Sequence, residues 1–143
     1  MKRLSTLLIA LIFALSAFAQ TTNQVVFSFN HKAGADPMVL DQTVFTIWNN
    51  KKVKLTRAEF YISDVEIHLA DNTTLPLTDQ YMLVNALNPT AEHDLGQWAA
   101  GAAHGLTLHL GVPQSVNHND PAAWPAGHPL APQNPTMHWG WTS

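Results

Sequence analysis

Short runs of β-branched and aromatic residues, separated by turn residues, recur along the chain after residue 20. Runs of this kind, bounded by Asn, Asp, Gly or Pro, are typical of β-strands. Asn-Asn and Asp-Asn pairs at 49–50 and 71–72 predict turns. The predicted strands are 25–29, 43–48, 51–55, 58–69, 80–85 and 106–112. Because many short strands follow one another at regular spacing, we expect an all-β fold, an antiparallel β-sandwich of Ig-like or Greek-key type.

The segment 58–69 carries the clearest strand pattern. Apolar and polar residues alternate on both sides of Ser63 and Asp64, but the phase shifts by one residue between them. A period of two that slips in this way indicates a bulge or a bend within one long strand. One helix is conceivable at 91–104, which is rich in alanine, although Gly96 and Gly101 weaken it.

The composition changes at Pro113, because six of the nine prolines lie between residues 113 and 135. Repeated proline predicts neither helix nor central strand here. The segment also holds Trp124 and several histidines, which a linker would normally lack. We therefore expect a long Pro-, His- and Trp-rich loop that is ordered against the sandwich, and long ordered loops usually have a function.

The first residues are typical of a secretory signal peptide. Lys2 and Arg3 precede an apolar run, and an Ala-Phe-Ala pattern ends at Ala19. A membrane anchor is the alternative, but the run is shorter than the roughly 20 residues that span a bilayer. We therefore predict a cleaved signal peptide at 1–19 and one domain at 20–143, located in the periplasm or secreted by a Gram-negative-type cell, with no membrane attachment after cleavage.

Charge and composition exclude several classes of protein. There are 7 Lys and Arg against 10 Asp and Glu, so nothing resembles a nucleic-acid footprint. The absence of Cys excludes disulfides, iron–sulfur clusters and thiolate copper sites. A Gly-x-Ser-x-Gly motif and a Gly-rich phosphate loop are also missing. Metal binding remains, because the chain has eight His and soft Met donors.

No local zinc-type spacing occurs, so a metal site would have to combine distant segments. His31 ends the first predicted strand, His128 precedes Pro129, and His138 follows Met137. Each also has a simpler interpretation: a solvent-facing strand end, an ordinary loop residue and an incidental residue of an apolar strand. Four of the remaining histidines, His68, His93, His104 and His109, are predicted to lie at the surface. His118 lies in a polar turn and is assigned no role.

Five stretches occur in an order that carries a family resemblance. They are Phe-Ser-Phe-Asn-His at 27–31, Phe-Tyr-Ile-Ser-Asp-Val at 60–65, Gly-Val-Pro at 111–113, His-Pro-Leu at 128–130 and Met-His-Trp-Gly-Trp-Thr-Ser at 137–143. Together they resemble the MbnP-like copper-binding domain family over nearly the whole exported chain. The family pattern continues with Gly-Tyr and further strands, so the domain is expected to be incomplete at its C-terminus.

The resemblance implies an exported β-sandwich that binds copper. It places candidate metal ligands at His31, His128 and His138, with Met137 adjoining them. It also implies that a dihaem peroxidase-like partner of the MbnH type oxidises a Trp to kynurenine, for which Trp139 and Trp141 are the candidates. Kynurenine has an amine and a ketone, which are potential ligands that indole lacks.

Two functions from different classes follow from these residues. The first is an exported copper-binding protein, not an enzyme, that serves copper acquisition or homeostasis. The alternative is a secreted structural or interaction module whose Trp and Pro residues pack a loop. A cluster of convergent His would favour the first, and scattered His the second. A zinc hydrolase or copper oxidase is disfavoured, because nothing nominates a general base.

Overall fold

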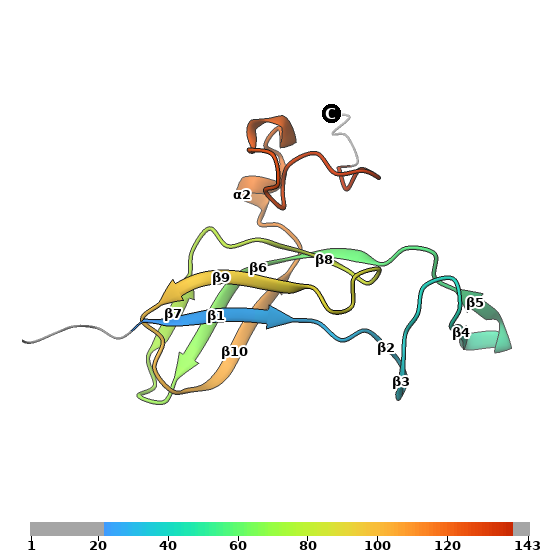
Figure 1. Cartoon of the computed structure of the whole chain (residues 1–143), viewed down its shortest axis with the longest axis horizontal. Helices are drawn as coiled ribbons and strands as arrows, with labels where there is room; N and C mark the ends of the chain where they lie inside the picture. Colours follow the sequence, from blue (N-terminus) through green and yellow to red (C-terminus); the bar gives the residue numbers. More distant parts are fainter. Residues whose placement is uncertain (1–21, 139–143) are drawn as a thin grey trace, which may run out of the picture.

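The computed structural model describes residues 22–138, in which two antiparallel sheets face each other (Figure 1). In the smaller sheet, β1 (Asn23–Ser28) pairs with β9 (Glu92–Trp98). The larger sheet is built on β6 (Glu59–Leu69), which pairs with β10 (Ala103–Leu110) along one edge. Along its other edge lie β7 (Thr74–Leu77) and β8 (Met82–Asn85). The predicted all-β sandwich is confirmed.

Apolar side chains from both sheets form the core between them. The four-stranded sheet contributes alternate residues of β6 together with β7 and β8, and β9 contributes Leu95. Burying such side chains stabilises a fold by roughly 1.5–3 kcal/mol for each large one. The buried members are Ile62, Val65, Ile67, Leu77, Met82, Val84, Leu95 and Ala100. Phe27, Phe29, Phe60 and Trp98 are partly buried and pack against this core.

The predicted bulge in the long strand is confirmed. Asp64 has a φ of 46°, and the pairing with β10 shifts there. Ser63 lies opposite His109, whereas Glu66 lies opposite Thr107, so β6 carries one extra residue. The extra residue resets the alternation. As a result both Ile62 and Val65 face the core, with 5% and 1% of their surface exposed.

The helix considered for 91–104 is wrong. This segment forms β9, a short connection and the start of β10. Phe27 of β1 lies opposite His93, and Gly96 has a φ of 85°, which a helix does not allow. Pairing with β1 therefore overrides the helix propensity of the alanines. The strand predicted at 106–112 begins earlier, at Ala103, and ends at Leu110.

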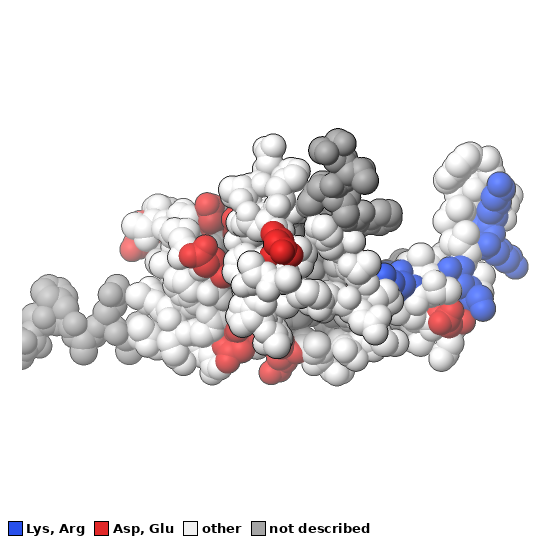
Figure 2. Space-filling view, turned by 90° about the horizontal axis from the view of Figure 1, so that it is seen from above, with Lys and Arg blue, Asp and Glu red and all other residues white. Residues whose placement is uncertain are grey.

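Two small hairpins extend from one end of the sandwich (Figure 1). One joins β2 (Lys32–Ala33) to β3 (Asp36–Pro37), which the sequence pattern did not predict. The other joins β4 (Val44–Thr46) to β5 (Lys52–Lys54) through a 3₁₀ turn at Trp48–Asn50. Figure 2 shows that Lys and Arg gather at this end, whereas Asp and Glu lie mainly over the sandwich.

The Pro-rich loop is ordered, as predicted, and packs on the sandwich through Leu130 and Ala131, which are buried. The prediction that its prolines exclude helix is wrong for two single turns. These are α2 (Gln114–Asn117) and a 3₁₀ turn at Pro121–Ala123. Pro113 precedes the first turn and Pro121 begins the second, and proline is tolerated at such starts because the N–H it lacks would have no helical partner.

Within residues 22–138, no helix combines the length and the hydrophobicity needed to cross a bilayer. The predicted signal peptide at 1–19 and the two candidate tryptophans, Trp139 and Trp141, lie outside the described residues.

Candidate metal-binding site

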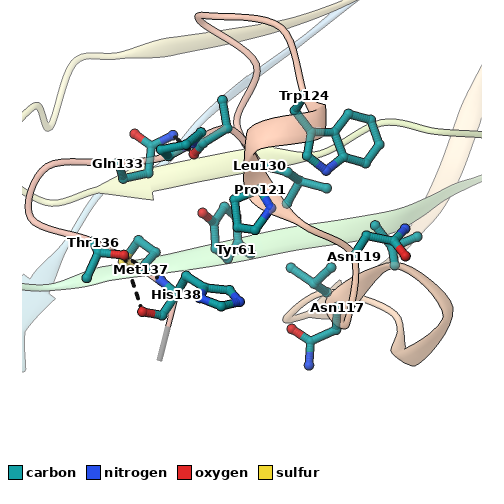
Figure 3. A pocket seen from close by; sticks show the side chains of 14 residues that line it. Tyr61, Asn117, Asn119, Pro121, Trp124, Leu130, Gln133, Thr136, Met137 and His138 are labelled. Carbon is teal, nitrogen blue, oxygen red and sulfur yellow. Dashed lines mark hydrogen bonds between the residues drawn. The ribbon is translucent and has the colours of Figure 1, made fainter. Parts of the chain in front are cut away.

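The loop after β10 borders a small, partly open cavity of about 60 Å³ against Tyr61 of β6 (Figure 3). Met137 and His138, which sequence reasoning nominated together, both line it. Trp124 and Leu130 close other parts of the wall. The strand therefore supplies a rigid floor, and the loop supplies the side chains that could bind a metal.

Hydrogen bonds hold the loop over this floor. The Tyr61 hydroxyl donates to the Pro129 carbonyl at 3.2 Å. The Gln133 side chain donates to the same carbonyl at 3.1 Å and to the Ala131 carbonyl at 2.8 Å. Burial, with a smaller contribution from the negative charge of Glu59, raises the pKa of Tyr61 above its usual value. The phenol therefore stays protonated and acts as a donor.

A local turn sets the position of His138. Its backbone N–H donates to the Thr136 hydroxyl at 3.0 Å, and that hydroxyl donates to the His138 carbonyl at 3.2 Å (Figure 3). These bonds fix the backbone of His138 while its imidazole forms part of the cavity wall. The Met137 sulfur accepts a hydrogen bond from Nη2 of Arg57 at 3.2 Å.

His128 is engaged differently. Its imidazole stacks on the indole of Trp124, with ring centroids 4.3 Å apart and planes within 9°. Its Nδ1 accepts the backbone N–H of Leu130 at 3.1 Å. In a neutral ring the accepting nitrogen carries no proton, so the proton lies on Nε2. His128 lines a neighbouring groove and not the first cavity, whereas Trp124 lines both.

His31 lines neither the cavity nor this groove. Its ring meets Phe60 edge-on, with centroids 6.0 Å apart, and its carbonyl accepts the Met38 N–H at 2.9 Å. The structure thus brings Met137 and His138 together, places His128 against Trp124 in the neighbouring groove, and leaves His31 outside both. Among residues 22–138, no three His, Asp or Glu side chains gather closely enough to hold a metal ion. The ligand roles therefore stay predictions.

Two residues near these sites were not nominated from sequence. His93 was expected at the surface, but it is half-buried, lines the groove with His128 and meets Phe29 edge-on at 5.6 Å. Burial lowers the pKa of His93 below its usual value. If this segment had been identified as a strand, the alternation of its residues between two faces would have placed His93 on the same side as the buried Leu95. Arg57 lies just before the Phe-Tyr-Ile-Ser-Asp-Val strand, but nothing in the sequence pattern indicated that it reaches Met137.

His68, which was expected to face solvent opposite the core, is half-buried, and both of its ring nitrogens have polar neighbours. Its two ring nitrogens lie 3.2 Å from the Thr74 hydroxyl and 2.8 Å from the Thr107 hydroxyl. Its ring centroid is 6.3 Å from that of His104. This pair belongs to the β6–β10 ladder, whereas the cavity is built against Tyr61 by the loop that follows β10.

The fold and this site define an all-β protein in which a Pro-rich loop carries His and Met donors over a strand of a two-layer sandwich. The sequence profile of the MbnP family matches residues 22–143, so the chain belongs to the MbnP family. Searches among curated proteins and among solved structures gave no match.

Proposed function

We propose that the chain is an exported copper-binding protein that serves copper acquisition or homeostasis and is not itself an enzyme. Its family is associated with methanobactin and copper. The observation that carries the proposal is the convergence of His138 and Met137 on one cavity of the ordered loop.

The chemistry of the cavity suits copper among the common metals. Imidazole binds copper, zinc, iron and nickel, and thioether sulfur is a soft donor that favours Cu(I). Hard cations such as Mg²⁺ or Ca²⁺ prefer carboxylate ligands. None of the described residues that line the cavity carries a carboxylate. His138 would be the principal donor, and Met137 would add a second only if its sulfur released the Arg57 N–H.

Metal binding by His128 would break a hydrogen bond that its imidazole makes in the structure. To present Nε2 as a donor, the neutral ring would have to carry its proton on Nδ1 and give up the Leu130 N–H. A buried N–H left without an acceptor costs about 1–3 kcal/mol. Because His138 lines the cavity together with Met137, whereas His128 and His31 do not, we propose His138 ahead of them as the copper ligand. The finer proposal, that an MbnH-type enzyme converts Trp139 or Trp141 to kynurenine and so completes the site, rests on the resemblance.

The test begins with the full chain, expressed with its own leader in a Gram-negative host and purified. Cu(I), Cu(II) and Zn(II) are offered against a competing chelator, and retained metal is measured by elemental analysis. We expect copper to be retained in preference to zinc. His138→Ala should abolish that retention, whereas His109→Ala, an exposed residue of β10, is the matched control and should not.

If copper is retained only after co-expression with the dihaem partner, mass spectrometry of a short peptide from the C-terminal end should show the Trp-to-kynurenine conversion. That peptide is released by a protease other than trypsin, because no Lys or Arg follows Arg57. A protein that retains no copper with or without the partner would contradict the proposal.

The second candidate is a secreted structural or interaction module without metal. One observation favours it: the described His, Asp and Glu side chains form no group of three suited to a metal ion. The same experiment separates the two, because such a module would show no preference for copper over zinc and no effect of His138→Ala.

A further inference from the structure

One side chain, Arg57, ties the loop that carries Met137 and His138 to the sandwich. Its Nη2 donates to the Pro135 carbonyl at 3.0 Å and to the Met137 sulfur at 3.2 Å. Its Nε donates to Oε2 of Glu59 at 2.6 Å, and its Nη2 forms an ion pair with the same oxygen. A single guanidinium therefore joins the start of β6 to a segment about 80 residues further along the chain.

The anchor of this contact is rigid. Glu59 lies opposite Asn85 in the β6–β8 ladder, and the Asn85 side chain donates to its Oε1 at 2.7 Å. Both carboxylate oxygens are thus engaged, and only 12% of the Glu59 side chain is exposed. The planar guanidinium presents several donors in a fixed geometry, so Nε and Nη2 can hold Glu59 while Nη2 also reaches the loop. Lysine, with one ammonium, lacks this geometry.

The contact has a consequence for metal binding by Met137. A thioether sulfur that accepts an N–H from a guanidinium has a lone pair directed at a positive charge. The sulfur has a second lone pair, but a copper ion bound there would still lie within a few ångströms of the guanidinium, where the like charges of copper and Arg57 repel each other. Arg57 and copper therefore compete for the Met137 sulfur.

We propose that Arg57 is a positioning residue that holds Met137 out of the copper shell, while the Thr136–His138 turn is held by its own hydrogen bonds. This rests on the proposed function. The shell would then be centred on the imidazole of His138, and Met137 would become a ligand only after Arg57 is removed.

The position of Met137 can be tested without copper. Apart from Met1, the chain has three methionines, Met38, Met82 and Met137, so each of these positions gives its own methyl NMR signal in labelled protein. Arg57→Gln should shift the Met137 signal, which Met137→Leu assigns, and leave that of Met82, a buried core residue, unchanged. Lys54→Gln removes one exposed cation nearby in sequence and is the matched control. A Met137 signal that does not move in Arg57→Gln would overturn the proposal.

The copper part is tested by competition with a Cu(I) chelator. Met137→Leu alone should leave Cu(I) affinity within about twofold, because the sulfur is not in the shell. Arg57→Gln should raise affinity about tenfold, the lower end of effects from residues that surround metal ligands. The double variant Arg57→Gln/Met137→Leu should lose that gain, and Arg57→Lys should fall between native protein and Arg57→Gln.

Two results would contradict the proposed competition between Arg57 and copper for the Met137 sulfur. They are a large loss of Cu(I) affinity in Met137→Leu alone and no gain of Cu(I) affinity in Arg57→Gln. Failure of the proposed function looks different, because no variant would then retain copper in the elemental analysis. The methyl signals would still decide whether Arg57 positions Met137.

Discussion

The indole of Trp124 and the imidazole of His128 lie face to face, with centroids 4.3 Å apart and planes within 9°. Tyr81 approaches both rings at about 6 Å, so the pair forms a small aromatic cluster between β8 and the loop. The cluster and the Leu130 N–H bond to His128 together hold the His-Pro-Leu turn in place. This arrangement explains the His-Pro-Leu motif structurally, without requiring His128 to bind metal.

The Trp124–His128 contact should be measurable as a coupling energy. Aromatic pairs contribute about 0.5–1.5 kcal/mol beyond their buried area. We expect a coupling of that size between Trp124→Ala and His128→Ala in a double-mutant cycle followed by urea unfolding. His104→Ala, which lies on β10 beside His68, should show a coupling to Trp124→Ala near zero. Purely additive effects of Trp124→Ala and His128→Ala would show that the stacking adds nothing to stability.

Asp64 allows a test of the bulge. Its φ of 46° lies in the left-handed region, where a β-branched residue is strained by about 1–2 kcal/mol. Asp64→Val should therefore lower the free energy of unfolding by that amount, whereas Asp64→Gly should change it by less than about 1 kcal/mol. Glu66→Val, two residues along the same strand, is the control and should be tolerated. Equal effects of Val at both positions would contradict the left-handed conformation of Asp64.

The long strand β6 could be predicted from the sequence, because its apolar and polar residues alternate clearly. The alternation that slips at Ser63 and Asp64 reports the bulge directly, since each residue of a strand faces one side. A helix was wrongly considered for the segment 91–104, because its alanines have a high intrinsic helix propensity. Its strand conformation depends on pairing with β1, about 70 residues away along the chain, and local propensity does not contain that information.

The site was less predictable for a related reason. Met137 and His138 are neighbours in sequence, so their convergence on one cavity follows from their adjacency. The positions of His31 and His128 depend on what packs beside them, namely Phe60 and Trp124, and spacing along a chain does not specify such contacts. The role of Arg57 could not be predicted, because two of its partners, Pro135 and Met137, lie about 80 residues further along the chain.

Ser63 offers a test of buried polarity. It has no exposed surface, and its hydroxyl has no hydrogen-bond partner within the part of the chain that the structure describes. A buried hydroxyl without a partner costs about 1–3 kcal/mol in proteins. Ser63→Ala should therefore raise the free energy of unfolding by about 1 kcal/mol, measured in urea. Thr73→Val, which removes a hydroxyl bonded to Asp71 at 2.6 Å, should give no such gain. A loss of stability in Ser63→Ala would show that the hydroxyl is satisfied in solution.

His93 should make stability depend on pH. Burial beside Phe29 lowers its pKa below the usual 6.5, so the folded chain holds the ring neutral at a pH at which the unfolded chain already protonates it. The unfolded state then binds more protons, and stability falls as the pH drops below about 6.5 until the folded-state pKa is reached. His93→Phe keeps an aromatic ring against Phe29 and removes the titration. Urea unfolding at about pH 7.5 and about pH 5.5 should therefore show a smaller loss in His93→Phe than in the native chain, because the contributions of the other histidines are common to both. An identical loss in the two proteins would mean that the His93 imidazole is solvated in the folded state.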